Sequence, residues 1–269
     1  MADLTFKGTT QQVLFEIGKG ASSKIDANTK VTITDNEYTL GNLTTITTTV
    51  TANKIKLEKT SAAVDFADTF TNLNAVLPKV EKYTGPVTLT DAGGVSAANL
   101  NTIAAATSGK VTATLKADTA SNLVTALTDT APAQINAINV TVNDTIVDAA
   151  NLAKVAGVSK WTSGKIKVDS LEVAGDFVEV NELYITNKAQ FTGLGNEKVV
   201  LEDANVSALN VDAIAKATSG ILEAVVTDAT ANVLVSQLKN ANAKDALTIK
   251  VIDGAAGTTT SAKDLLTLD

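Results

Sequence analysis

Apolar and polar residues alternate in several short stretches of the chain, and each of these stretches ends in an acidic residue. In the stretch VTLTD, Val87 and Leu89 fall on one face of an extended chain, and Thr88 and Thr90 fall on the other. The pattern therefore predicts a short strand that is buried on one side. Five such stretches recur about every 50 to 60 residues: Val31–Asp35, Val87–Asp91, Ile138–Asp144, Val199–Asp203 and Leu247–Asp253.

A short amphipathic segment follows each of the first four stretches, with Leu or Val three residues before Ile or Val. This spacing predicts a helix with one apolar side. The four segments are Asn42–Ile46, Ala98–Ala106, Ala150–Gly157 and Leu209–Ala217. The tripeptide TSG then occurs at Thr107–Gly109, Thr162–Gly164 and Thr218–Gly220, and glycine after a short helix predicts a left-handed cap.

A second strand and a second helix complete the pattern. The second strands are expected in Lys110–Ala117, Lys165–Val173 and Ile221–Thr227. Asp or Thr begins each second helix, where its side-chain oxygen accepts hydrogen bonds from the free amides of the first turn. These helices are expected in Ala67–Leu77, Ala117–Leu127 and Asp228–Leu238.

The same order of elements is written twice in closely related residues. Val95–Leu127 and Val206–Leu238 align without a gap, and about half of their positions are identical. A unit of strand, helix, strand and helix takes about 50 residues, so each half takes about 25, a length typical of leucine-rich-repeat coils. One coil cannot bury its apolar face alone, whereas stacked coils can. The sequence therefore predicts an α/β fold, a leucine-rich-repeat-like solenoid of short strand–short helix coils over residues 1–269.

The two ends of the chain and one internal stretch depart from a complete, regular solenoid. Gly8–Ile17 resembles the second helix and Thr260–Leu266 resembles the first, so we expect the chain to be a segment of a longer array. The alternative is a complete protein whose ends are capped by diverged coils. The irregular stretch 176–196 (Asp176–Asn196) shows strand-like alternation where a helix is expected. It predicts either a change from helix to strand on one side of the solenoid or a junction.

The composition excludes several classes of function. The net charge is −7, all 22 basic residues are lysines, and the chain has neither cysteine nor histidine. Disulfides and thiolate metal sites are therefore impossible. Because the bidentate forks of arginine are missing, nucleic acid and anionic membrane surfaces are poor partners. No apolar run approaches about 18 residues, so membrane insertion is not expected, and the first residues do not form a classical signal peptide.

The repeated phrases resemble those of a known group of proteins. ADTASNLVTAL, ADTFTNLNAVL, VTLTD and VTITD are similar to the repeat regions of large type I-secreted, RTX-associated bacterial surface proteins, S-layer-like proteins and giant adhesins. This resemblance implies export to the bacterial cell surface, a structural role and, in many members, calcium binding. The glycine-rich nonapeptide that binds calcium in RTX proteins is not present, because Gly93–Gly94 is followed by Val-Ser-Ala.

The acids at the strand ends are the candidate site. If the predicted coils stack, these carboxylates would form an acidic ladder whose mutual repulsion Ca²⁺ would relieve. The alternative is that each aspartate makes a turn or caps the following helix. The five residues are Asp35, Asp91, Asp144, Asp203 and Asp253.

Other candidates have simpler explanations. Outward threonines such as Thr88 drift in identity between units, which argues against a regular ice-binding lattice. Trp161 suits either packing or a sugar ring. Glu179 and Glu182 form a carboxylate pair, but strand alternation explains them without glycosidase chemistry. Without a nucleophile–base pair, a zinc ligand set or a phosphate loop, we do not expect an enzyme.

These observations favour an extracellular structural protein on the bacterial cell surface, a self-assembling block of the S-layer type. Its expected partners are further copies of the chain or neighbouring surface proteins. The alternatives are a spacer segment of a giant adhesin, or a surface module that binds calcium or a glycan. A glycan-binding module would need clustered aromatic residues, and aromatics make up only 4% of this chain.

Overall fold

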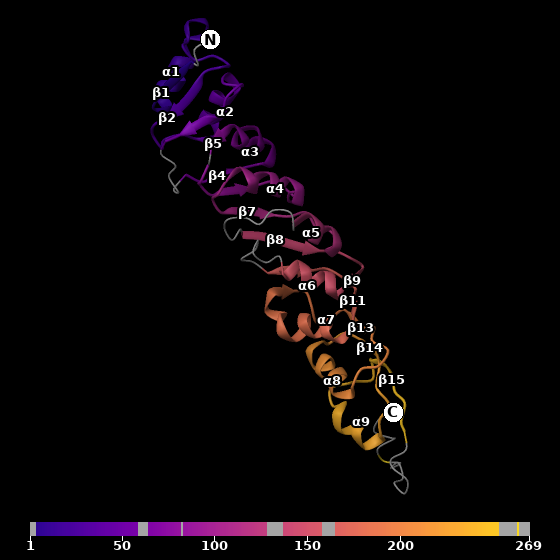
Figure 1. Ribbon diagram of the computed structural model, residues 1–269. Coiled ribbons are helices and arrows are strands. Elements are labelled where there is room, and N and C mark those ends of the chain that lie inside the picture. Colours follow the sequence, from indigo (N-terminus) through magenta and orange to yellow (C-terminus); the bar gives the residue numbers. More distant parts are fainter. Residues whose placement is uncertain are drawn as a thin grey trace. The chain divides into compact units, whose positions relative to one another are not determined.

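The computed structural model describes residues 4–58, 64–81, 83–127, 137–157, 165–252 and 263. The chain has a mixed α/β fold in which short strands and short helices alternate and the paired strands run parallel (Figure 1). It divides into two compact units: Met1–Lys116, Ala126–Val140 and Ser159–Gly164 form unit 1, and Ala117–Thr125, Thr141–Val158 and Lys165–Asp269 form unit 2.

Unit 1 contains two groups of parallel strands. The first is a four-stranded sheet of order β1-β2-β3-β5, and the second places β4, β6, β7 and β8 side by side. The strands are β1 (Thr5–Gly8), β2 (Lys30–Ile33), β3 (Ile55–Leu57), β4 (Phe66–Asp68), β5 (Val80–Glu81), β6 (Val87–Leu89), β7 (Val111–Thr114) and β8 (Ala137–Val142), whose last two residues belong to unit 2.

The helices of unit 1 pack against one another in chain order, α1 on α2, α2 on α3 and α3 on α4 (Figure 1). Their bounds are α1 (Thr10–Ile17), α2 (Leu40–Thr49), α3 (Phe70–Val76) and α4 (Ala97–Ala106), with 3₁₀ turns at η1 (Gly20–Ser22) and η2 (Leu77–Lys79). The helix α5 (Ala120–Leu127) begins in unit 2 and ends in unit 1.

Unit 2 contains a five-stranded parallel sheet of order β15-β14-β13-β11-β9, and in this unit β10 also pairs in parallel with β12. The strands are β9 (Ile146–Asp148), β10 (Ile166–Val168), β11 (Glu172–Gly175), β12 (Phe191–Thr192), β13 (Lys198–Leu201), β14 (Leu222–Val225) and β15 (Ala246–Thr248).

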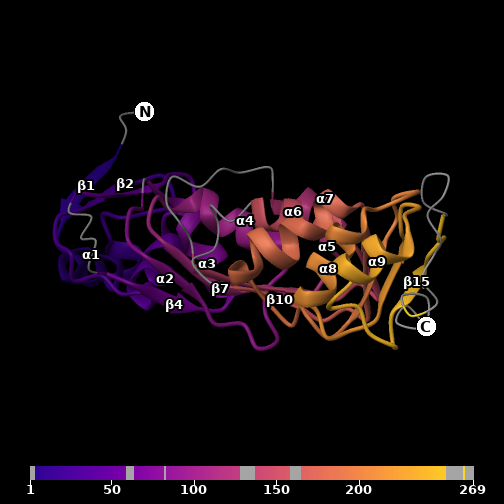
Figure 2. The same ribbon diagram turned by 90° about the horizontal axis from the view of Figure 1, so that it is seen from below.

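In unit 2 the helices α6, α7, α8 and α9 follow one another along one side of the strands (Figures 1 and 2). Their bounds are α6 (Ala149–Gly157), α7 (Phe177–Asn181), α8 (Ala208–Ala217) and α9 (Ala231–Gln237), with a π-helical turn η4 (Glu182–Thr186) and a 3₁₀ turn η5 (Lys188–Gln190). Among the described residues, no helix is long and apolar enough to cross a membrane.

A nearly constant length of chain separates the paired strands. Thr5 pairs with Lys30, and Glu172 pairs with Lys198. The separation is somewhat shorter where Phe66 pairs with Val87, and where Val95 and Leu115 form an isolated bridge. The predicted half-unit of about 25 residues, the length of a leucine-rich-repeat coil, therefore corresponds to the distance along the chain between hydrogen-bonded neighbours.

The core lies between the strands and the helices. In most described strands every second residue is buried, as the pattern of VTLTD predicts: Val87 is fully buried and Leu89 nearly so, whereas Thr88 is half-buried and Thr90 is exposed. Leu100 and Ile103 of α4 are buried at the three-residue spacing that the sequence predicted. The same spacing holds for Val211 and Ile214 of α8.

Of the two predictions for 176–196, the change from helix to strand is wrong, and the junction stays a prediction. Residues 177–190 form α7, η4 and η5, and strand structure returns only in β12. Asp176 and Glu179 form a capping box that starts the helix, since Asp176 Oδ1 accepts from Glu179 N at 2.9 Å. Val180, Leu183 and Tyr184, spaced at helical intervals, are buried, so helical packing determines the structure here.

The predicted left-handed caps at the TSG tripeptides are also wrong where the structure describes them. Gly109 and Gly220 do not have positive φ angles. Instead each glycine lies against the backbone of the preceding strand–helix segment: a Cβ on Gly109 would lie 1.9 Å from the oxygen of Gly85, and one on Gly220 would lie 1.8 Å from the oxygen of Glu197. Glycine is required here by close backbone approach. Gly164 lies outside the described residues.

Candidate functional site

Four of the five predicted aspartates occupy equivalent places in the structure. We call Asp35, Asp91, Asp144 and Asp203 the capping aspartates, because each carboxylate accepts a hydrogen bond from the first backbone amide of a helix that precedes it in the chain. The donors are Thr10 N of α1 to Asp35 (2.9 Å), Phe70 N of α3 to Asp91 (2.7 Å), Ala120 N of α5 to Asp144 (2.7 Å) and Phe177 N of α7 to Asp203 (2.6 Å).

Each capped helix begins 21 to 26 residues before its aspartate. Asp35 in addition accepts from the hydroxyl of Thr10 at 2.6 Å. The expectation that the aspartates cap the following helix is therefore corrected, because they cap a helix of the preceding strand–helix segment. A carboxylate in this place satisfies an amide that has no partner within its own helix and lies at the positive end of the helix dipole. Asp253 lies outside the described residues.

Among the described residues, the capping aspartates are not part of a group of acids that could hold a metal ion. Within the described part of the chain, no group of three or more His, Cys, Asp or Glu residues is arranged to hold a metal ion. The strands that precede two successive capping aspartates are not neighbours, because β7 lies between β6 and β8. Neighbouring strands are about 4.8 Å apart, so strands two places apart are separated by about 10 Å. One Ca²⁺, with ligands at about 2.4 Å, does not span that distance. The calcium ladder stays a prediction.

A second set of acids explains the repeated DT-x-x-N phrase. Asp68 Oδ1 accepts from Thr69 N at 2.7 Å and from Asn72 Nδ2 at 2.8 Å. Asp118 makes the same two bonds with Thr119 N and Asn122 Nδ2, both at 2.8 Å. The hydrogen bond from Asn72, followed by that from Thr69, lowers the pKa of Asp68 below its ordinary value. The sequence patterns did not identify these residues as a unit, although the same Asp–Asn spacing is visible in both phrases.

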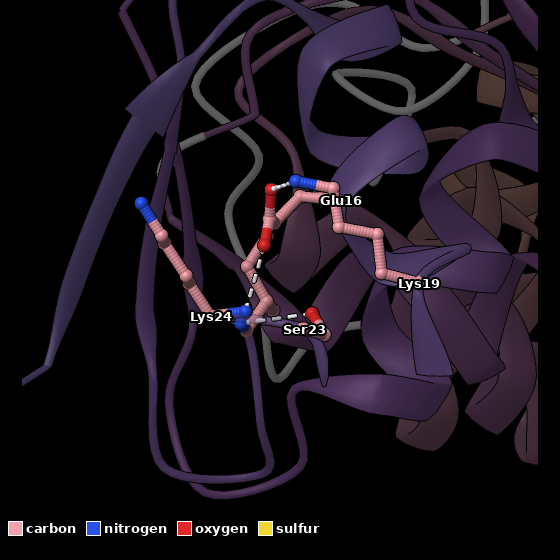
Figure 3. A network of polar contacts seen from close by, with 5 residues as sticks. Glu16, Lys19, Ser23 and Lys24 are labelled. Atoms are coloured by element: carbon pink, nitrogen blue, oxygen red, sulfur yellow. Dashed lines mark hydrogen bonds and ion pairs between the residues drawn. The ribbon is translucent and has the colours of Figure 1, made fainter. Parts of the chain in front are cut away.

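Glu16, near the end of α1, is the centre of a polar network in unit 1 (Figure 3). Its carboxylate accepts from Lys19 Nζ at 2.5 Å and from Lys24 N at 2.8 Å, and Ser23 Oγ accepts from Ile25 N at 3.0 Å. The side-chain hydrogen bond from Lys19, then the backbone bond from Lys24, lowers the pKa of Glu16. Glu16 therefore fixes the chain after α1 in a turn.

Unit 2 contains a buried tyrosine–glutamate pair. Tyr184 donates its hydroxyl hydrogen to Glu197, and Glu197 also accepts from Gly195 N at 2.9 Å and Asn196 N at 3.0 Å. Burial, and next the charge of Glu197, raises the pKa of Tyr184 well above its ordinary value. Every contact of this pair holds the loop before β13 against η4, which is a structural arrangement.

The other sequence candidates have local structural roles or fall outside the described residues. Glu179 accepts from the backbone of Asp176 at 3.3 Å, and Glu182 accepts from the side chain of Asn187 at 3.1 Å. Thr88 and Thr112 face each other on neighbouring strands. Trp161 lies outside the part of the chain that the structure describes.

A hollow in unit 1 has a volume of about 730 Å³. It lies beside η2, β5 and the end of α4, and its lining includes Lys54, Pro78, Tyr83 and Thr102. The hydroxyl of Tyr83 donates to Val64 O at 2.6 Å. The lining carries no carboxylate and no nucleophile–base pair among its described residues, so its shape alone indicates no chemistry.

Comparisons with protein-family models, with curated proteins and with solved structures find no match for this chain.

Proposed function

We propose that this chain is a structural building block of an extracellular bacterial coat, of the S-layer type, built as a solenoid of strand–helix coils of about 25 residues. The observation that supports the proposal best is the nearly constant separation along the chain between paired strand residues. Strands about one such coil apart in the sequence pair in parallel in both units. Such stacking gives each coil contact with its neighbours only, an architecture that extends by repetition.

Contacts between successive segments support the same proposal. Each capping aspartate accepts a hydrogen bond from a helix of the preceding strand–helix segment. Thr107 Oγ1 likewise donates to Gly85 O, in the preceding segment, at 2.9 Å. The equivalent threonine Thr218 donates to Gly195 O at 3.2 Å. These contacts recur at similar offsets, which favours a scaffold over a site for chemistry. The bacterial cell surface as its location follows from the resemblance of the DT-x-x-NL and VTLTD phrases.

Assembly is the property that tests the proposal. Light scattering and negative-stain microscopy of the purified chain, with CaCl₂ raised to the millimolar range and then removed with EDTA, should show large ordered particles. If particle growth depends on Ca²⁺, single substitutions of Asp35 and Asp91 by asparagine would show whether the capping aspartates bind it. The Asn side chain keeps an acceptor for the helix amide and removes the charge.

A monomer that remains unchanged under all these conditions would contradict the coat and favour the alternative of a spacer segment in an adhesin. A spacer uses the same repeated scaffold without lateral contacts, so only the state of association separates the two functions.

A further inference from the structure

The described strands of the parallel sheets carry solvent-accessible side chains on the side that faces away from the core. Parallel sheets in most α/β proteins have helices on both faces. Here the outward strand residues are exposed in β7 and β14 and half-buried in β11 and β13, where they alternate with buried residues. A sheet face that carries exposed side chains is available for docking against another surface.

The first sheet of unit 1 has an outward face rich in lysine. We call it the lysine face; it consists of Lys7, Lys30, Lys54 and Lys56 with Glu58 and Glu81. Lys7 forms an ion pair with Glu58 at 2.6 Å, and Lys56 is paired in register with Glu81. A shallow hollow of about 360 Å³ lies on this face, and all four lysines line it. The face therefore carries more positive than negative charge.

The five-stranded sheet of unit 2 has an outward face of opposite character. We call it the acidic face; it consists of Asp148, Glu172, Glu202 and Glu223 around Lys198. Lys198 bridges Glu172 at 3.3 Å and Glu223 at 2.7 Å, and the bond to Glu223 is the main cause that raises the lysine pKa. A hollow of about 460 Å³ lies beside Val200 and Val225, and Ile146 on the same face is 58% exposed.

The charge difference extends over the whole of each unit. Unit 1 has 12 lysines against 11 acidic residues, and unit 2 has 10 lysines against 18. The net charges are therefore +1 and −8, which together give the −7 of the chain. Two acidic faces repel each other, whereas the lysine face and the acidic face attract.

We propose that the lysine face of one copy of this chain docks on the acidic face of a second copy. The lysine ammonium groups then lie near Glu172, Glu202 and Glu223, and their aliphatic stems cover the exposed Ile146 and Val225. Because the two faces differ and lie in different units, every docked pair leaves one lysine face and one acidic face open. Such a contact extends into a chain of copies when its rotation does not close a ring. The inference rests on the proposed coat function and names the contact that would build it.

Sedimentation velocity of the full chain tests this contact. The wild-type chain should associate at about 20 mM NaCl, and association should weaken at least about tenfold at about 500 mM NaCl, where the Debye length falls to a few ångströms. The triple variant Lys7→Gln, Lys30→Gln, Lys56→Gln removes the lysine face, and Glu172→Gln, Glu202→Gln, Glu223→Gln removes the acidic face. Each variant alone should remain monomeric at the low salt concentration.

Mixing the two variants gives the sharper result. The lysine-face variant still has its acidic face and the acidic-face variant still has its lysine face, so an equimolar mixture should form heterodimers and stop there. The control variant Lys154→Gln, Lys216→Gln, Lys239→Gln makes the same change of charge at exposed lysines in α6, in α8 and after α9. It should associate like the wild-type chain. Circular dichroism and the melting temperature of each variant show whether it is folded.

Three outcomes would overturn the inference. If folded face variants associate as strongly as the wild-type chain, the docking contact is wrong while the coat function stands. Assembly that persists at the high salt concentration and requires Ca²⁺ would also exclude this contact and leave the coat function in place. A wild-type chain that is monomeric in every condition would contradict both.

Discussion

At the scale of single residues, the contacts that hold successive segments together are few and specific. Each capping aspartate accepts a hydrogen bond from an amide 21 to 26 residues earlier in the chain. Gly109 and Gly220 permit a backbone approach that no other residue allows. Each contact joins parts of the chain that are distant in sequence. We therefore expect the loss of one contact to lower the stability of the fold.

Substituting Asp91 by alanine should lower the free energy of unfolding by about 1 kcal/mol, because the amide of Phe70 loses its acceptor. Asp91→Asn should retain most of the stability, since the amide oxygen still accepts. The control is Asp169→Ala, which removes an exposed aspartate paired with Lys167 at 3.1 Å and should change stability by less than about 0.5 kcal/mol. Urea unfolding followed by circular dichroism measures all three, and equal effects of Asp91→Ala and Asp169→Ala would contradict the capping role.

Substituting Gly109 by alanine should destabilise the protein by about 2 kcal/mol, because the new Cβ meets the carbonyl of Gly85 and the two backbones must move apart. The matched control is Gly157→Ala at the end of α6, where a Cβ meets nothing within 4 Å. That change should be neutral or slightly stabilising, since alanine favours the helix. Thermal unfolding of both variants decides the matter, and a neutral Gly109→Ala would show that the approach is not tight.

At the scale of elements, the helices are too short to be stable alone. The longest described helices, such as α2, α4 and α8, have 10 residues, and isolated helices of this length are marginal in water. They form because Leu or Val packs on the strands and because local side chains accept hydrogen bonds from their first turns. In α1, α3, α5 and α7 a distant carboxylate accepts from the first amide. The helix α7 shows the balance clearly: its residues alternate like a strand, yet the capping box of Asp176 and the distant carboxylate of Asp203 start a helix.

Acid should weaken the ends of elements in unit 1. The pKa values of Glu16, Asp26 and Asp68 are lowered from ordinary values of 4.5, 3.8 and 3.8 by hydrogen bonds made in the folded state. Because the unfolded chain binds these protons more readily, the stability they contribute is present above about pH 4.5 and is lost as the pH falls through the lower folded values. The urea midpoint should therefore be flat between about pH 7 and pH 5.5 and fall below about pH 4.5.

The variant Glu16→Gln tests the origin of this fall. It removes one of the three carboxylates and should make the decline with acid shallower, although the protein starts from a lower stability at neutral pH. A pH dependence identical to that of the wild-type chain would show that Glu16 does not contribute.

At the scale of the whole molecule, the two units differ in charge more than in structure. Both are built from short parallel strands and short helices, but unit 2 has a net charge of −8. Self-repulsion of this size destabilises a compact state and is screened by salt.

Raising NaCl from about 20 to about 500 mM should therefore stabilise unit 2 by about 1 kcal/mol, which slows its amide hydrogen exchange about fivefold. The stability of unit 1 should remain nearly unchanged. Hydrogen exchange followed by mass spectrometry resolves the two units, at a protein concentration low enough to keep the chain monomeric. Equal protection of both units by salt would contradict an origin in the charge of unit 2.

Local patterns in the sequence predicted most of the elements. The alternation of Val87 and Leu89 identified β6, and the spacing of Leu100 and Ile103 identified α4, because side-chain periodicity depends on only a few neighbouring residues. Four of the five candidate aspartates follow described strands, as the sequence predicted. Their partners were not found, since the hydrogen bond from Phe70 N to Asp91 connects residues that are far apart along the chain.

The sequence by itself determined the alternation of strands and helices, the faces they bury and the length of about 25 residues between repeats. Only the tertiary structure decided what the repeated polar residues do. Gly109 has its role because the backbone of Gly85 lies beside it, and Asp203 caps α7 because β13 is paired in register with β11. Periodicity is a local property of the chain, whereas close approach and hydrogen-bond partners arise when distant segments come together.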